Sequence, residues 1–440
     1  MEETHEEKKE INAAQGLKAL SPLFLMIILF VGLSIYFHDF YKTPLIILFV
    51  VSSIFSLCLL KRKTLNDRIA VFSRCAADTN LLLMVWIFIL AGAFASSAKA
   101  MGAVDATVNL TLSFVPHNML LAGIFIATCF VSLSVGTSVG TVVALVPVAA
   151  GLAHQTGVHV PLVVAVVVGG AFFGDNLSFI SDTTVVATRT QGCRMKDKFR
   201  TNFLISLPAA VLTIGLYIWM GMGTFQEVAP THFQFVKVIP YLFVLLAAVM
   251  GMNVMIVLAL GILLTGIIGM ACGAFDLAGW FSHISSGIAD MSELIIISML
   301  AGGLLGVVRE LGGIAWILDS LTRRVRNRRG AEYSIALIVS ITNCCTANNT
   351  IAILTVGDLV RDIAQKYGVD PRKSASILDT FSCCVQGCIP YGVQLLMASG
   401  LAAVSTAEII PYLYYPFLLF FFAVLAIHFH FPRFRTKPNS

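Results

Sequence analysis

A polar run at positions 174 to 184, Gly-Asp-Asn-Leu-Ser-Phe-Ile-Ser-Asp-Thr-Thr, lies inside a long apolar segment of this chain. Carboxylates inside a membrane cost about 2.5 to 3.5 kcal/mol each on insertion scales, so they usually mark an ion or proton path. Asp175 and Asp182 are seven residues apart, a spacing that predicts two turns on one face of a helix. The alternative interpretation is a polar helix end at the lipid interface.

Two further runs interrupt apolar segments with polar residues. Residues 134 to 141, Ser-Val-Gly-Thr-Ser-Val-Gly-Thr, offer the oxygens of Thr137 and Ser138 beside glycines that let the backbone turn. Residues 342 to 350 offer the amides of Asn343, Asn348 and Asn349. Backbone carbonyls freed at such breaks can coordinate a cation. Small polar residues also serve as helix-packing contacts in membranes, and this alternative stays open for each single Ser or Thr.

A further intramembrane carboxylate is predicted at Asp379, in the run from 378 to 392. Thr380, Ser382 and Gln386 are polar groups of the same run, and Gly387 with Pro390 would break a helix there. This run is therefore the expected counterpart of residues 174 to 184.

The composition indicates a polytopic membrane protein. The 440 residues are 58% hydrophobic and only 12% charged, with a mean hydropathy of +0.87. So few charges cannot cover a soluble globule, and the apolar runs suffice for about ten spans. Most of the ten cysteines fall in apolar runs, which predicts packing residues rather than disulfides. We attribute the net charge of +5 to the topology of a membrane protein and not to nucleic-acid binding, so no nucleic-acid partner is expected.

The two apolar runs from 118 to 153 and from 333 to 365 are too long for one helix across about 30 Å of hydrocarbon. We interpret each as a re-entrant hairpin that enters and leaves on one side. Of the 29 Lys and Arg residues, Lys42, Lys99 and Lys237 then fall outside, Arg309 lies near a span end, and the other 25 are cytoplasmic. This asymmetry predicts that both termini face the cytoplasm.

The apolar runs repeat at a shift of about 210 residues, which gives each half five spans and one hairpin. Because five is odd, the second half should lie upside down, the inverted-repeat plan of secondary transporters. The predicted fold is thus an all-α polytopic membrane protein with broken helices at mid-membrane. Its predicted parts are a cytoplasmic tail (1–19), a first repeat (20–222), an external linker (223–235), a second repeat (236–432) and a cytoplasmic tail (433–440).

The chain contains one pattern that resembles an enzyme motif and one that resembles a metal site. Neither is complete, and no enzyme is predicted. Residues 136 to 140 fit Gly-x-Ser-x-Gly, but a nucleophile elbow needs a strand, a turn and a helix with His and acid partners. Five cysteines, at positions 344, 345, 383, 384 and 388, lack the Cys-x-x-Cys spacing usual in soft-metal sites. No resident cofactor is expected.

The runs 136 to 141 and 174 to 184, with Asp379-Thr380 and Ile389-Pro390-Tyr391, resemble the NhaC-type Na⁺/H⁺ antiporters. The resemblance extends from about residue 20 to 430. The chain departs from the family's pattern at Phe179, where members usually have Pro, and at Tyr391, where they usually have Trp. The resemblance implies the ion transporter superfamily, in which a transport domain with hairpins and broken helices moves as an elevator.

The leading hypothesis is exchange of Na⁺ for H⁺ across the cell membrane, with membrane lipid around the protein. The alternative is a Na⁺- or H⁺-coupled carrier of a small organic acid or amino acid. No unpaired Lys or Arg is expected at the centre, which favours a cation as the sole substrate. A homodimer is compatible with the sequence. The predicted ion- and proton-binding residues are Asp175, Asn176, Ser178, Ser181, Asp182, Thr137, Ser138, Asn348, Asn349, Asp379, Thr380 and Ser382. Among them, Asp175, Thr137, Ser138, Asn349 and Asp379 are the hypothetical Na⁺ ligands, because hard cations prefer oxygen.

Overall fold

The computed structural model describes residues 13–36, 45–61, 63–114, 116–178, 181–222, 234–250, 252–323 and 325–434, and within these ranges the secondary structure is helical. In the first half the helices are α1 (Ala13–Tyr36), α2 (Leu45–Leu59), α3 (Leu65–Ala76), α4 (Thr79–Met101), α5 (Ala103–Phe114), α6 (Leu120–Val135), α7 (Ser138–Thr156), α8 (Val160–Leu177), α9 (Asp182–Gln191) and α10 (Met195–Gly221). In the second half they are α11 (Ile239–Val249), α12 (Val254–Ala271), α13 (Leu277–Asp290), α14 (Ser292–Glu310), α15 (Gly313–Thr322), α16 (Arg328–Thr346), α17 (Asn349–Lys366), α18 (Pro371–Gln386), α19 (Val393–Ala402), α20 (Thr406–Ile409) and α21 (Tyr414–His428).

The chain divides into two compact units. The smaller one comprises Met1–Asp78 and Met299–Val325, and within it α1 packs on α2 and α15. Lys63 and Glu310 form an exposed ion pair of 2.9 Å inside this unit. The larger unit comprises Thr79–Ser298 and Arg326–Ser440, and it contains all the residues predicted to bind ions.

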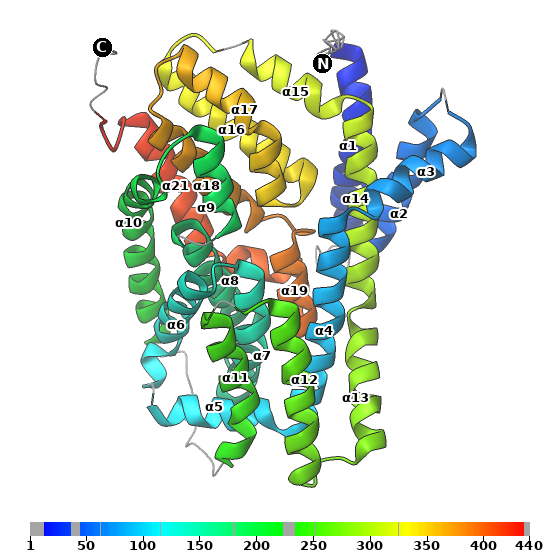
Figure 1. Ribbon diagram of the computed structural model, residues 1–440, viewed down its shortest axis with the longest axis vertical. Helices are drawn as coiled ribbons and strands as arrows, with labels where there is room; N and C mark the ends of the chain where they lie inside the picture. The colour runs from blue at the N-terminus through cyan, green and yellow to red at the C-terminus, as the bar shows by residue number, and fades with distance from the viewer. Residues whose placement is uncertain are drawn as a thin grey trace, which may run out of the picture. The chain divides into compact units, whose positions relative to one another are not determined.

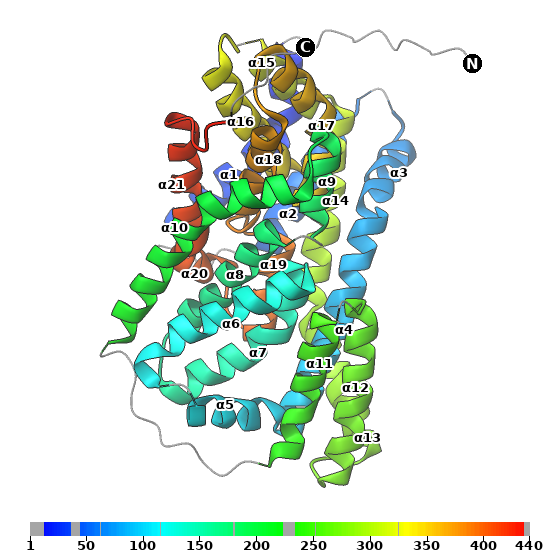
Figure 2. The same ribbon diagram turned by 60° about the vertical axis from the view of Figure 1, so that its left-hand side comes forward.

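The centre of the larger unit is α8, which packs against α6 and α7 (Figures 1 and 2). Every residue from Pro161 to Leu177 except Phe173 is buried. The approach to α6 requires glycine, because a Cβ on Gly174 would lie 2.2 Å from the Cβ of Ser132. Small residues let membrane helices pack this closely. The segment is thus a rigid support for the polar residues at its end.

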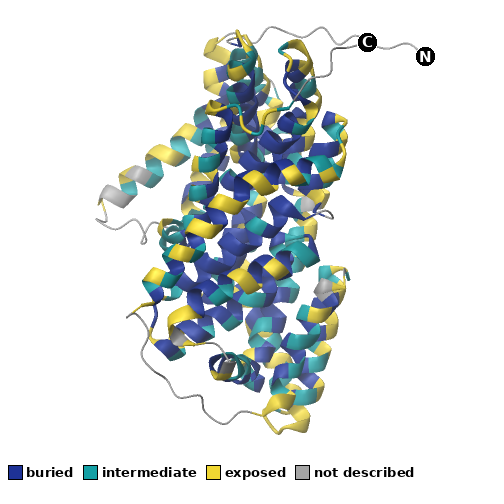
Figure 3. Ribbon diagram, turned by 90° about the vertical axis from the view of Figure 1, so that its left-hand side faces the viewer, coloured by how far each residue is buried: buried dark blue, intermediate teal, exposed yellow. Residues whose placement is uncertain are grey.

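The second half repeats this arrangement around α18, on which α16 and α17 pack. Helix α9, which follows the break after α8, packs on both α17 and α18. The two halves therefore meet at their broken helices. Figure 3 shows many residues of the central helices in dark blue, the colour of buried residues, with exposed residues in yellow between them.

The backbone has the same conformation at the two predicted hairpin tips. In the first, Gly136 has a φ of 72° and Thr137 is extended; in the second, Ala347 has a φ of 51° and Asn348 is extended. A second left-handed position recurs at the same shift of 211 residues, since Gly157 matches Gly368. In each half, two helices joined by this turn are followed by a third, α8 or α18, and the inverted repeat expected from the apolar runs stays a prediction.

Within the described residues, seven helices or fused helix pairs are long and apolar enough to cross a membrane. The number rises to eight if the bent pair Val393–Ala402 and Thr406–Tyr412 counts as one span. This pair bends by 101°. Five further apolar helices in the described part of the chain, such as Leu120–Val135 and Tyr414–His428, are shorter. The structure therefore supports an all-helical fold with about seven or eight candidate spans, and the expected number of ten stays a prediction.

Candidate functional site

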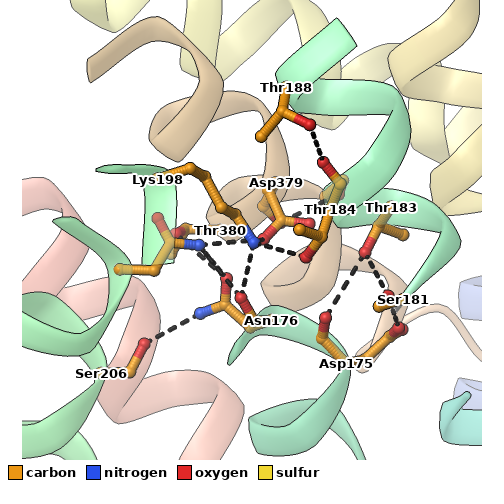
Figure 4. Close-up of polar contacts among 12 residues, drawn as sticks. Asp175, Asn176, Ser181, Thr183, Thr184, Thr188, Lys198, Ser206, Asp379 and Thr380 are labelled. Carbon is orange, nitrogen blue, oxygen red and sulfur yellow. Dashed lines mark hydrogen bonds and ion pairs between the residues drawn. The ribbon is translucent and has the colours of Figure 1, made fainter. Parts of the chain in front are cut away.

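Asp175 lies in the last turn of α8 and collects donors from three other places in the chain. The hydroxyls of Ser138 and Ser181 donate to its carboxylate at 2.9 and 2.5 Å, and the side-chain amide of Asn349 donates at 3.2 Å. Asp175 is 5% exposed, so water does not replace these donors. Figure 4 shows Ser181 beside the carboxylate, where the chain re-enters α9 after the break. Through these hydrogen bonds the carboxylate connects both hairpin tips with the interruption between α8 and α9.

The Ser138 hydroxyl is oriented by a chain of two amides. Gln394, at the start of α19, donates to Ser138 Oγ at 2.9 Å, so the hydroxyl proton is free to point at Asp175. Gln386 donates in turn to Gln394 Oε1 at 3.0 Å and to the carbonyl of Ala347 in the second hairpin tip at 3.0 Å. The second broken helix thus fixes the donor that the first hairpin presents.

A second buried centre contains the ion pair of Lys198 and Asp379. The ammonium of Lys198 lies 2.5 Å from Asp379 Oδ2, and the two side chains are 1% and 0% exposed. Lys198 also donates to the carbonyl of Asn176 and to Thr184 Oγ1, both at 2.7 Å. As Figure 4 shows, this one side chain from α10 joins the end of α8, the first turn of α9 and α18.

Asn176 connects this centre to its surroundings. Its side-chain oxygen accepts from Asn202 at 2.6 Å and from the Thr380 hydroxyl at 3.4 Å, and its amide donates to Ser206. Asn202 also donates to Asp379 Oδ2 at 2.9 Å. The two neighbours Asp175 and Asn176 therefore serve different networks, because they project to different sides of the end of α8.

The other predicted site residues do not reach the carboxylate of Asp175 through any contact described here. Ser178 donates to the carbonyl of Leu133, and Ser382 donates to that of Asp379 in its own helix. Asn348 caps α17 by accepting from the amide of Ile351 at 3.0 Å. Thr137 sits half-buried at the N-terminus of α7, next to Ser138. These four residues shape the breaks from which Ser138, Ser181 and Asn349 project.

The expectation for Asp182 is wrong in one respect. Asp175 and Asp182 do not share one face of a continuous helix, because α8 ends at Leu177 and a new helix, α9, begins at Asp182. Asp182 is exposed in the first turn of α9, whereas Ser181 beside it is buried against Asp175. An acidic residue is favourable at a helix N-terminus, which accounts for Asp182 there. Phe179 and Ile180, in the break itself, are outside the described residues.

Lys198 and Lys373 both count as cytoplasmic in the predicted topology, and the structure shows that both side chains are buried among the helices. Lys198 is at the centre, and Lys373, 2% exposed in the first turn of α18, donates to the carbonyls of Ala426 and Phe431. Lys198 is nevertheless paired, as the expectation of no unpaired cation at the centre requires. Sequence reasoning gave no role to Thr184, the last residue of the run from 174 to 184. It also missed Asn202 and Gln394, which look like ordinary polar residues of apolar helices.

Among the described residues, no group of three His, Cys, Asp or Glu side chains is arranged to hold a metal ion, and the ten cysteines are free thiols. The site offers instead one carboxylate among hydroxyl and amide oxygens. Such oxygens are the ligands that hard monovalent and divalent cations take. A buried carboxylate of this kind can also carry a proton, since burial disfavours charge. The arrangement is therefore chemically suited to bind a small cation or a proton inside a helical protein with candidate membrane spans.

Comparison with known proteins agrees with a site of this kind. The profile of the Na⁺/H⁺ antiporter family matches residues 18–222 and 224–431. The Na⁺/H⁺ antiporter NhaC of Alkalihalophilus pseudofirmus is 26% identical over 78% of this chain and 80% of its own length. The malate-2H⁺/Na⁺-lactate antiporter of Bacillus subtilis is 22% identical over 79% of this chain and 81% of its own. An uncharacterized Na⁺/H⁺ antiporter of Haemophilus influenzae is 24% identical over 90% of this chain and 92% of its own.

The chain belongs to the Na⁺/H⁺ antiporter family, because the family profile covers nearly all of it. Its apolar helices and this membership make it an integral membrane protein. The resemblance to NhaC-type antiporters noted in the sequence is thereby confirmed.

Proposed function

We propose that this antiporter exchanges Na⁺ for H⁺ at Asp175, which binds either ion but not both. The observation that supports this most is the set of three neutral donors on one buried carboxylate, Ser138, Ser181 and Asn349. Each donor also has an oxygen that can ligate Na⁺ once its side chain turns. A proton on Asp175 removes the charge that attracts Na⁺, so the two ions compete for one group.

The proposed ligand set differs from the one expected from sequence. Ser181 enters it, and Asp379 leaves it because Lys198 already occupies its Oδ2 atom. In this proposal the side chain of Thr137 is not a Na⁺ ligand, and the residue contributes to the site only through its backbone at the turn. In this proposal Asn176 and Thr380 belong to the Lys198 centre and do not touch the transported ion.

Transport of a small organic acid instead of, or together with, Na⁺ is the rival function. A carboxylate substrate needs a positive group at the centre, and Lys198 is the cation found there in the described part of the chain. Its three N–H donors already meet Asp379, Asn176 and Thr184. This favours a cation as the sole substrate, although the relative from Bacillus subtilis is named for malate and lactate.

We base a proposed arrangement in the membrane on the uneven distribution of Lys and Arg and on the turns that recur in the two halves. Both termini face the cytoplasm, residues 223–235 face outward, and the second repeat lies inverted relative to the first. The two helix pairs α6–α7 and α16–α17 are then re-entrant hairpins whose tips meet at Asp175. We further propose that the larger unit's hairpins and broken helices move together as the transport domain of an elevator.

The experiment that tests the exchange uses purified protein in proteoliposomes with a pH-sensitive dye inside. A Na⁺ gradient should drive proton movement in the parent protein, with no requirement for any of a panel of organic and amino acids. Asp175→Asn should abolish this movement, and Asp358→Asn should leave it nearly unchanged, since Asp358 is 92% exposed and paired with Arg361 at 3.3 Å. Flux that needs an organic acid would support the rival.

A further inference from the structure

Asp175, near the end of α8, and Asp379, in α18, are both buried but have different kinds of partner. Asp379 has a cation on one of its oxygens, Lys198 at 2.5 Å. Asp175 has hydroxyl and amide donors, which carry no net charge. The distinction matters because an unpaired charge in such a place costs several kcal/mol, whereas a paired one is already compensated.

Lys198 is firmly placed in this pair. It is 1% exposed, and its other two contacts, the Asn176 carbonyl and Thr184 Oγ1, come from opposite sides of the break between α8 and α9. A carbonyl at the end of a helix lies at the negative end of the helix dipole, where an ammonium is favourable. To leave Asp379, Lys198 would have to abandon both halves of the broken helix together.

We infer that Lys198 is a built-in cation that permanently occupies Asp379, so that Asp175 is the one carboxylate through which ions exchange. The pair contributes no net charge, and the centre takes up one monovalent cation at a time. The exchange is then one proton per Na⁺ and moves no net charge across the membrane. This inference rests on the proposed function, and it makes Lys198 a positioning residue rather than an ion ligand.

The charge of Asp379 is then needed only to balance that of Lys198. Asp379→Asn should abolish exchange, because it leaves an uncompensated ammonium beside the site that must attract Na⁺. Removing both charges, in Lys198→Met with Asp379→Asn, should restore exchange to within about tenfold of the parent, since a buried pair replaced by neutral groups is often tolerated. If Asp379 carried the ion or the proton, the double variant would stay inactive.

The test measures Na⁺-driven proton flux in proteoliposomes for the parent, Asp379→Asn, the double variant, and Lys196→Met as a control on the same helix. Lys196 is exposed and should behave as the parent does. The proton-to-sodium ratio follows from the pH gradient that just balances a tenfold Na⁺ gradient at zero potential, about one pH unit for a ratio of one and half of that for two. A potential imposed with K⁺ and valinomycin should not shift this balance.

The outcomes separate the two proposals. A parent that exchanges at a ratio of one, together with a double variant that regains exchange at the same ratio, supports the inference. A parental ratio of two, or a folded double variant without exchange, overturns it while leaving Na⁺/H⁺ exchange intact. No Na⁺-driven flux in the parent overturns the proposed function and the inference with it. The parental ratio decides even if a variant fails to fold.

Discussion

Ser138 and Asn349 donate to the same oxygen atom, Oδ2 of Asp175, although 211 positions separate them in the chain. Each is the first helical residue after a left-handed turn and an extended residue in its own half. Equivalent points of the two repeats therefore converge on one carboxylate. In the proposed transport cycle, movement of either helix pair would therefore change this site, as alternating access requires.

The shared oxygen predicts non-additive effects of two substitutions. Ser138→Ala and Asn349→Ala each remove one donor to a charged group, worth about 1.5 to 3 kcal/mol, and one candidate Na⁺ ligand. Both losses favour a proton over Na⁺ on Asp175, so the Na⁺ concentration for half-maximal exchange should rise about tenfold or more for each. The double variant should lose less than the sum of the two effects, because both act on one atom.

Ser134→Ala is the control for that series. Ser134 is in α6, the other arm of the helix pair that contains Ser138, and its hydroxyl donates to the carbonyl of Phe130 within α6. It should exchange as the parent does. Strictly additive effects of Ser138→Ala and Asn349→Ala would show that the two tips act on the ion independently.

Competition at one carboxylate predicts a simple pH dependence. In the pH range where Asp175 takes up its proton, each unit of acidification should weaken the apparent Na⁺ affinity about tenfold, because each proton bound removes a site. The maximal rate should change little. Half-saturation by Na⁺, measured in proteoliposomes at several pH values, gives the slope. An affinity that does not vary with pH would mean that Na⁺ and the proton use separate groups.

Close packing of α6 and α8 predicts a strong effect of one methyl group. A Cβ on Gly174 would be 2.2 Å from that of Ser132, so Gly174→Ala must push the helices apart, at a typical cost of 1 to 3 kcal/mol. We expect a lower melting temperature in detergent and weaker Na⁺ binding, since Asp175 is the next residue. Gly215→Ala, in α10 with nothing within 4 Å of its Cβ, should melt at or above the parental temperature.

The proposed topology predicts opposite accessibility for two loops. Single cysteines replacing Arg326 and Gln226, in a background without the ten native cysteines, should react with a membrane-impermeant maleimide from opposite sides. Arg326 lies in the described part of the chain between α15 and α16, whereas Gln226 lies outside it. Labelling of both from the same side in intact cells would contradict the inverted repeat.

The sequence predicted the meeting of the hairpin tips at Asp175 because that depends on long apolar runs, their repeat and a polar interruption in each. It did not predict the role of Lys198. A lysine near the end of an apolar run usually reaches the membrane surface, and only the packing of α10 against α8 and α18 shows that this one turns inward. The misplacement of Asp182 has a similar cause, since helical spacing between two residues holds only if the helix does not break between them.

The two hairpin tips have the same backbone conformation but present different polar groups to Asp175. Gly136-Thr137-Ser138 presents a hydroxyl, and Ala347-Asn348-Asn349 presents an amide. If the second half is inverted as proposed, the two tips belong to opposite sides of the membrane, and ions arriving from the cytoplasm and from outside would first meet different ligands. A carrier with symmetrical architecture would then run faster in one direction than in the other when driven by equal and opposite gradients.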